Sequence, residues 1–360
     1  MMRSRAGGEV VSIQYLRGVA AILVVAAHAC DQFVSGPVEP AVRLIGQGGV
    51  DIFFVVSGYV MTWTAAANNY DRATFFRRRI TRIVPLYWVL TFFTAALLAG
   101  AGGLARDSRF AWGDLIASLL FIPHVNAGAA GIVAPTLKLG WTLNYEMFFY
   151  AWFGAFIGLT PFLRTACLSF VFSLFFAAAL LWHPGGAVLG FWSNPIIVEF
   201  LFGCLVGCLD VRGVTQRLPG GVWLAILVFG AVSFLVLGGL DRDLAYRAAL
   251  RGIPAFLIVL AAIGWERGAV AIRRSGVLHF LGDASYSIYL THLFAIVGLR
   301  VLWLWAGLPT SETIDGSIFA SIAVCIGTGA GCAAYLLLER PLIALVRRGS
   351  RHWSPSRSPA

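Results

Sequence analysis

Ten stretches of this 360-residue chain are apolar over about the length that crosses a lipid bilayer, and this pattern determines the fold class. They lie at 13–33, 49–67, 83–103, 140–160, 163–182, 190–209, 221–240, 251–266, 279–305 and 316–346. With 59% hydrophobic and only 12% charged residues, the chain has too little polar surface for a water-soluble globule. The sequence therefore predicts an all-α, multi-pass membrane protein with about ten transmembrane helices.

The distribution of basic residues predicts the orientation of these helices. An eleventh apolar stretch, near 110–124, is short and contains Asp114, Pro123 and His124, so we interpret it as an interfacial or re-entrant helix. With ten spans and the N-terminus inside, 18 of the 27 Arg and Lys residues fall on the inner side and 7 on the outer side. An eleventh span would place the basic C-terminal tail outside, against the positive-inside rule. Both termini are therefore predicted to be cytoplasmic.

One membrane domain is predicted over residues 1–348, followed by a short basic tail at 349–360 that we expect to be disordered. The first apolar stretch lacks a small-residue cleavage site, so we interpret it as a retained helix rather than a signal peptide. The net charge of +10 is typical of basic cytoplasmic loops and does not indicate nucleic-acid binding. Cys204 and Cys208 have no further soft ligands nearby, so no metal site is predicted.

Two ionisable residues share one face of the first predicted helix. Arg17 and His28 are eleven residues apart, which is about 20° beyond three helical turns and about 16 Å along the axis. Ionisable groups inside spans are costly and usually face a cavity or a partner. The structural alternative is an arginine that reaches the interface and a histidine that is satisfied in the interior.

Two carboxylates are predicted near the depth of His28, in the outer half of the bilayer. Asp51 lies at the start of the second span, and Glu146 follows Thr142 at the start of the span at 140–160. A carboxylate at this depth can orient an imidazole and stabilise its protonated form. The alternative is that both acids serve as helix caps.

A basic segment that contains Arg77, Arg78, Arg79 and Arg82 precedes the third span on the predicted inner side. Arg79 and Arg82 share a helix face, and their planar guanidinium groups match the geometry of phosphate. We interpret these two residues as ligand contacts and the first two as signals that set topology. A topological role for the whole segment is the alternative.

A polar stripe marks the span at 279–305. Ser285, Tyr289 and His292 recur at i, i+4 and i+7, and Tyr286 lies beside them, so these four residues are candidates for a pocket. Hydrogen bonding between helices is the alternative role. Glu339, near the end of the last span, is expected to pair with an arginine.

Six motifs occur in an order that resembles one family. They are Arg17-x10-His28, Gly49-Val50-Asp51-Ile52-Phe53-Phe54-Val55-Val56-Ser57-Gly58, Arg79-x-x-Arg82-Ile83-x-Pro85-Leu86-Tyr87, Trp141-Thr142-Leu143-x-x-Glu146, Ser285-Tyr286-x-x-Tyr289-Leu290-x-His292 and Glu339-x-Pro341. Over about residues 10–342 the chain is similar to the acyltransferase-3 family of integral-membrane O-acyltransferases, and most similar to its exopolysaccharide O-acetyltransferase branch. Thr142 stands where the family commonly has serine.

The resemblance implies transfer of an acyl group from cytoplasmic acyl-CoA to a carbohydrate hydroxyl at the bacterial inner membrane. Acetyl is the default group and succinyl the alternative. The resemblance also implies that His28 is catalytic and that Arg17, Arg79 and Arg82 bind the donor. We expect acyl-CoA as a co-substrate, no permanently bound cofactor, and a polysaccharide or lipid-linked oligosaccharide as the acceptor.

The residues fit a base-catalysed mechanism. A neutral His28 would take the proton of the attacking sugar hydroxyl, with Asp51 or Glu146 orienting its ring. Tyr286, Tyr289 or a backbone N–H would stabilise the oxyanion. An acetyl-histidine intermediate is the rival route. A transporter or flippase for a glycan or another small solute is the alternative function, because a polar chamber within the membrane also serves solute passage.

Overall fold

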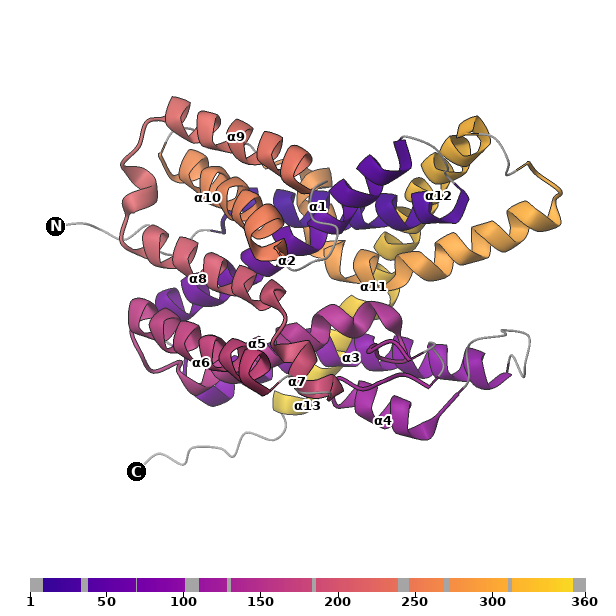
Figure 1. The fold of residues 1–360 in the computed structure, drawn as a ribbon, viewed down its shortest axis with the longest axis horizontal. Coiled ribbons are helices and arrows are strands. Elements are labelled where there is room, and N and C mark those ends of the chain that lie inside the picture. Colours follow the sequence, from indigo (N-terminus) through magenta and orange to yellow (C-terminus); the bar gives the residue numbers. More distant parts are fainter. Residues whose placement is uncertain are drawn as a thin grey trace.

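The computed structural model describes residues 9–33, 38–68, 70–100, 110–127, 131–182, 186–238, 246–268, 272, 274–309 and 313–351 (Figure 1). Within these ranges the chain is helical, with one isolated bridge between Val125 and Val133 and no strand, which confirms the predicted all-α class. The α-helices are α1 (Val11–Phe33), α2 (Val38–Asn68), α3 (Arg72–Gly100), α4 (Trp112–Leu119), α5 (Trp141–Ala155), α6 (Pro161–Trp182), α7 (Ala187–Trp192), α8 (Val198–Val211), α9 (Gly220–Gly238), α10 (Ile253–Gly268), α11 (Gly276–Trp305), α12 (Thr313–Ala334) and α13 (Arg340–Arg351). Between them lie 3₁₀ helices at Lys138–Gly140, Pro195–Ile197 and Val214–Gln216, and π-helical segments at Ala248–Gly252 and Tyr335–Glu339.

Eight helical segments among the described residues are long and apolar enough to cross a membrane. They are Val11–Phe33, Gly46–Asn68, Arg72–Gly100, Pro161–Ala178, Gly220–Gly238, Ala248–Gly268, Gly276–Trp305 and Asp315–Arg348. The other two predicted spans, 140–160 and 190–209, contain the shorter helices α5, of 15 residues, and α8, of 14 residues. The chain is therefore a multi-pass membrane protein, while the count of ten spans and the cytoplasmic termini stay predictions.

Two smaller predictions concern segments outside these long helices. The stretch 110–124 contains α4, whose 8 residues are too few to cross a bilayer as a helix, so the prediction of a short helix is confirmed. In the predicted tail, α13 continues to Arg351. Residues 352–360 lie outside the described part of the chain.

Helices α1 and α2 lie side by side at the centre of the bundle (Figure 1). Helix α8 packs on α2, and α11 packs on α1. Both contacts depend on glycine: a Cβ atom on Gly203 would lie 2.0 Å from the carbonyl oxygen of Val55, and one on Gly282 would lie 2.2 Å from that of Gln14. Such close backbone approaches are typical of small residues in membrane helices. The second approach holds α11 beside the turn of α1 that carries Arg17.

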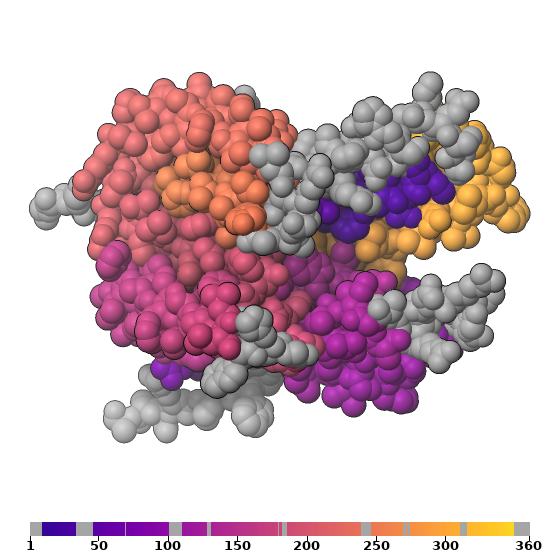
Figure 2. Space-filling view, in the orientation of Figure 1, coloured from indigo at the N-terminus to yellow at the C-terminus, as the bar shows by residue number. Residues whose placement is uncertain are grey.

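The interior is aromatic and the outer faces are apolar. Phe149 and Phe200 stack with ring centroids 4.5 Å apart in the core. The outward faces of α3, α6 and α9 expose side chains such as Phe92, Phe170 and Phe229, as expected where a protein meets lipid. In the space-filling view, an open notch separates the lobe formed by α11 and α12 from the lobe formed by α3 and α4 (Figure 2).

Candidate functional site

A cavity of about 290 Å³ lies between α1, α2, α3, α5 and α11. Its walls combine apolar side chains with three arginines, one glutamate and six hydroxyl groups. The polar lining residues are Gln14, Arg17, Ser57, Arg79, Arg82, Thr142, Glu146, Tyr150, Ser285, Tyr286 and Tyr289. Seven of the ten predicted site residues therefore meet in one place. The three that do not line this cavity are His28, Asp51 and His292.

Arg17 reaches the cavity from α1 and is held by neutral groups. Its guanidinium donates to Gln14 Oε1 at 3.0 Å and to Ser285 Oγ at 2.9 Å. The contact with Ser285 depends on the close approach of α11 at Gly282. Among the described residues no carboxylate lies within ion-pair distance of Arg17, so its charge is positioned without being neutralised.

Arg79 and Arg82 line the same cavity from α3. Neither guanidinium has a hydrogen bond or an ion pair with any residue in the described ranges, and Arg79 Nε is buried without a partner. By contrast, Arg78 is exposed, donates to the Tyr70 hydroxyl and lies 4.4 Å from the centre of its ring. The two ends of this basic segment therefore differ in their contacts, while their roles stay predictions. Two unpaired, half-buried guanidinium groups form an anion-binding surface.

The opposite wall carries a carboxylate with two hydroxyl partners. Glu146, on α5, accepts hydrogen bonds from the Tyr150 hydroxyl and from Ser57 Oγ, the second at 3.2 Å. With three arginines against this single lining carboxylate, the cavity has a net positive charge. An anionic ligand is therefore favoured over a cationic one.

The two tyrosines proposed as oxyanion donors already donate to backbone carbonyls. The Tyr286 hydroxyl donates to Ile83 O at 2.7 Å, and the Tyr289 hydroxyl donates to Leu139 O at 3.0 Å. A phenol has only one proton to donate. The Tyr289 hydroxyl oxygen also accepts a hydrogen bond, from Thr142 Oγ1 at 3.0 Å. The two hydroxyl groups therefore link α11 to α3 and to the start of α5. Each proton is already donated to a carbonyl oxygen, so the structure does not support a role for these tyrosines in oxyanion stabilisation.

His28 lies beyond the cavity on α1, next to a second histidine. Its Nδ1 is 2.9 Å from Val24 O and 3.3 Å from Nε2 of His292. The His292 ring is fully buried, and its centre is 6.2 Å from that of Tyr289, which lines the cavity. The stripe of Ser285, Tyr289 and His292 therefore does face α1 and α5. It contacts Arg17 at one end and His28 at the other.

The expectation that Asp51 or Glu146 orients His28 is wrong in this structure. Asp51 is fully buried and binds Arg247 through both oxygens, at 2.9 and 3.0 Å. The predicted depth of a side chain along α2 does not give the direction in which it points. The cavity-facing stripe of α2 includes Val50 and Phe54, and Asp51 lies about 100° around the helix from Val50.

Arg247 also approaches Glu199 on α8, at 3.8 Å. Arg247 lies between the predicted spans 221–240 and 251–266, so the sequence predicts an outer-loop charge and does not indicate this cluster. Its position four residues before the apolar stretch at 251–266 is the signal that the sequence offers.

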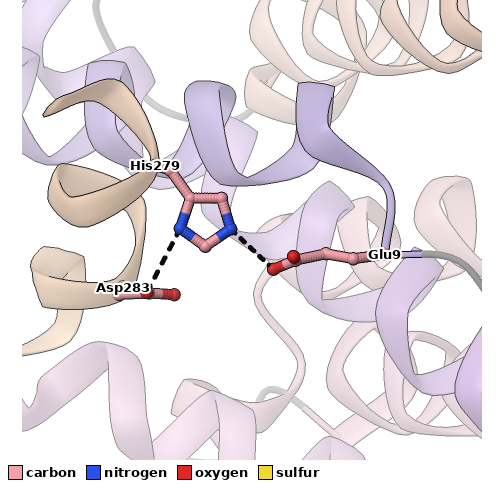
Figure 3. Close-up of side chains that lie close together, drawn as sticks. All are labelled: Glu9, His279 and Asp283. Atoms are coloured by element: carbon pink, nitrogen blue, oxygen red, sulfur yellow. Dashed lines mark hydrogen bonds and ion pairs between the residues drawn. The ribbon is translucent and has the colours of Figure 1, made fainter. Parts of the chain in front are cut away.

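A third group, Glu9, His279 and Asp283, lies where the start of α1 meets the start of α11 (Figure 3). Glu9 Oε1 is 2.8 Å from His279 Nε2, and Asp283 is 3.3 Å from His279 Nδ1. The two carboxylates contact opposite nitrogens of one ring, so a single ion cannot use both without rearrangement, and Arg274 lies 3.6 Å from Glu9. The geometry is that of an ionic clamp between two helices.

The clamp affects the protonation of Glu9, which precedes the first membrane helix. Partial burial raises the pKa of this carboxyl group, but hydrogen bonds with His279 and Gln14, together with the charges of His279 and Arg274, outweigh it. The net result is a pKa below the ordinary value for glutamate.

Comparison with known proteins places this architecture among acyl-transferring membrane proteins. Residues 10–336 match the family model described as "Acyltransferase domain". The chain is 35% identical to "Exopolysaccharide production protein ExoZ" of Rhizobium meliloti (strain 1021) over 306 residues, which are 85% of this chain and 91% of that protein. It is 27% identical to "Acyltransferase MdmB" of Streptomyces mycarofaciens over 94% of this chain and 92% of that protein. "Putative peptidoglycan O-acetyltransferase YrhL" of Bacillus subtilis (strain 168) is 30% identical over 78% of this chain and 48% of that protein. No solved structure matches the chain.

Proposed function

This chain is a membrane O-acyltransferase of the acyltransferase-3 family, and on that premise we propose that it transfers an acetyl group from acetyl-CoA to a sugar hydroxyl. The proposed acceptor is a surface polysaccharide or a lipid-linked oligosaccharide, in keeping with the names of two relatives, which refer to exopolysaccharide production and to peptidoglycan O-acetylation. The proposed location is the bacterial inner membrane.

The observation that carries the donor assignment is the set of three arginines in one cavity, two of which have no hydrogen bond or ion pair with any described residue. Acyl-CoA joins a polyanionic end to a neutral thioester through a flexible arm. One guanidinium group can donate hydrogen bonds to two oxygens of the same phosphate, so Arg79 and Arg82 suit the anionic end. The apolar lining between Val50, Phe53 and Met61 suits the arm.

We assign His28 as the general base. The sugar hydroxyl attacks the thioester carbonyl as Nε2 of His28 accepts its proton; the new C–O bond forms, the C–S bond breaks, and the proton then passes to the departing thiolate. A positioned base of this kind contributes about 10²–10⁴-fold to the rate. The rival route, in which the ring itself is acetylated first, uses the same nitrogen as the nucleophile.

The test uses the purified full-length chain in liposomes, with acetyl-CoA and surface polysaccharide isolated from a strain that lacks the gene. We expect release of CoA thiol together with new acetyl esters on the polysaccharide, detected by NMR. His28→Ala should fold normally and lose both signals, whereas His124→Ala, a histidine in the loop after α4, should retain them. A transporter would release no thiol. Thiol release that persists in His28→Ala would contradict both catalytic routes.

A further inference from the structure

We propose that His292 is a positioning residue for His28: it holds the His28 ring in the tautomer that leaves Nε2 free to accept a proton. This proposal rests on the proposed role of His28 as the base. It assigns to a second histidine the orienting function that Asp51 and Glu146 do not perform here.

The first step concerns the proton on His28 itself. Its Nδ1 lies 2.9 Å from the carbonyl oxygen of Val24, one turn earlier on α1. A carbonyl oxygen only accepts hydrogen bonds, so Nδ1 of His28 carries the hydrogen. In the neutral ring the lone pair is then on Nε2, at the other edge of the ring.

His292 repeats the same arrangement on α11. Its Nδ1 lies 3.0 Å from the carbonyl oxygen of Ile288, so this ring also carries its hydrogen on Nδ1. Its Nε2 therefore has a free lone pair. That Nε2 is the atom 3.3 Å from Nδ1 of His28. The two acceptors, Val24 O and His292 Nε2, thus share one hydrogen of His28.

The position of His292 is fixed by packing. The side chain is fully buried, and Gly327 of α12 lies against it: a Cβ atom on Gly327 would be 3.5 Å from His292 Cβ and 3.1 Å from a methyl group of Val25 on α1. At Gly331, an added Cβ atom would lie 2.4 Å from Ile288 Cα, so α12 packs tightly behind the same turn of α11. With α12 packed on this side of α11, the His292 ring lies with its Nε2 toward His28 on α1.

The consequence for catalysis follows from charge. When Nε2 of His28 takes the sugar proton, the ring becomes a cation and the Nδ1–H bond becomes more polar. Two acceptors then stabilise this cation and keep the ring aimed, as the third member of a catalytic triad does. His292 fulfils this role as a neutral ring, because two imidazolium ions at this distance repel each other.

Three substitutions separate positioning from packing. In His292→Gln the amide oxygen reaches about the place of Nε2 and keeps the acceptor. In His292→Asn the amide reaches only the place of Nδ1, and His292→Leu has no acceptor. We measure kcat and the KM for acetyl-CoA with the liposome assay, together with the thermal unfolding temperature in detergent. The His28→Ala variant serves as the reference for the base.

We expect kcat to fall about tenfold to a hundredfold in His292→Asn and His292→Leu, with the KM for acetyl-CoA unchanged, and to stay within about threefold of wild type in His292→Gln. Equal losses in all three variants, or a loss of kcat that follows the unfolding temperature, would overturn the positioning role, as would wild-type kcat in His292→Asn. If His28→Ala is inactive while His292→Asn is fully active, His28 remains the base and only this inference fails. Wild-type protein without thiol release would overturn both.

Discussion

Two of the groups of charged side chains in the described part of the helical bundle differ in whether they contain an internal ion pair. In the Asp51 cluster, which consists of Asp51, Glu199 and Arg247, one guanidinium binds both oxygens of Asp51. In the arginine wall, which consists of Arg17, Arg79 and Arg82, no ion pair forms among the described residues. The Asp51 cluster is buried and the arginine wall is half-buried, so the two groups differ in exposure as well as in pairing.

Buried charge is costly, and membrane proteins keep it where it is paired or where it serves function. Asp51 and Arg247 satisfy each other within the Asp51 cluster, and Glu199 adds a second, longer ion pair to the same guanidinium, which indicates a role in holding α2, α8 and the start of α10 together. The arginine wall has no ion-pair partner among the described residues, and an anionic ligand would supply the missing counter-charge. The comparison therefore separates residues whose charges pair within the protein from residues that we propose to bind the donor.

The largest expected effect is on stability, from Arg247→Leu. This change leaves Asp51 fully buried without its bidentate partner, and breaking such a pair costs about 3–5 kcal/mol. We expect a marked drop in the thermal unfolding temperature in detergent. The double variant Asp51→Asn with Arg247→Leu removes both charges of the pair and should recover part of the loss. An unfolding temperature unchanged by Arg247→Leu would show that the pair does not maintain the fold.

The next effect is on donor binding, from Arg82→Ala. Because Arg82 forms no hydrogen bond or ion pair with any residue that the structure describes, the unfolding temperature should change little. A lost hydrogen bond to a charged group is worth about 1.5–3 kcal/mol, which corresponds to a KM for acetyl-CoA raised roughly tenfold to 150-fold. Arg82→Lys keeps the charge but loses the planar fork, so it should fall in between. Arg77→Ala, at an exposed position on α3, is the matched control and should leave this KM unchanged.

The arginine wall could be predicted from the sequence, whereas the pairing inside the Asp51 cluster could not. Spacing along one helix fixes which side chains share a face, and this placed Arg79 with Arg82 and aligned Ser285 with Tyr289. Which face meets which neighbour depends on contacts between distant segments. Asp51 and Arg247 are 196 residues apart, and nothing local in either segment marks the other.

The contact between His28 and His292 could be predicted from the sequence only in part. The α1 face carries Arg17 and then His28, and the α11 face carries Ser285 and then His292, in the same order along both helices. Opposing the two faces brings Arg17 to Ser285 and His28 to His292, which the structure shows. The lengths of the helices in the stretches 140–160 and 190–209 were harder to predict. Their hydropathy does not show that α5 and α8 each begin only after a 3₁₀ turn, which shortens the α-helix.

A smaller effect is expected from Ser285→Ala, which tests how the arginine wall is held. Ser285 accepts a hydrogen bond from Arg17 at 2.9 Å, and Gln14 provides the remaining contact. Removing one of two holding contacts costs about 1 kcal/mol, so the KM for acetyl-CoA should rise about fivefold with little change in stability. Ser287→Ala, on the same helix but bonded to Glu339, is a comparison with no direct contact to Arg17. A rise in KM as large as that of Arg82→Ala would mean that Ser285 contacts the donor itself.

The smallest expected effect comes from the Glu9 clamp, where charges are paired but partly exposed to solvent. The pKa of Glu9 is lowered in the folded protein, so the unfolded chain takes up the proton first as the pH falls. The carboxylate therefore stabilises the fold above the ordinary pKa of about 4.3 and loses this contribution as the pH drops through its folded value. Between pH 7 and pH 4, the unfolding temperature of wild type should fall slightly more than that of Glu9→Gln, which has no carboxylate to titrate. Parallel curves would show that solvent screens the charges of the clamp completely.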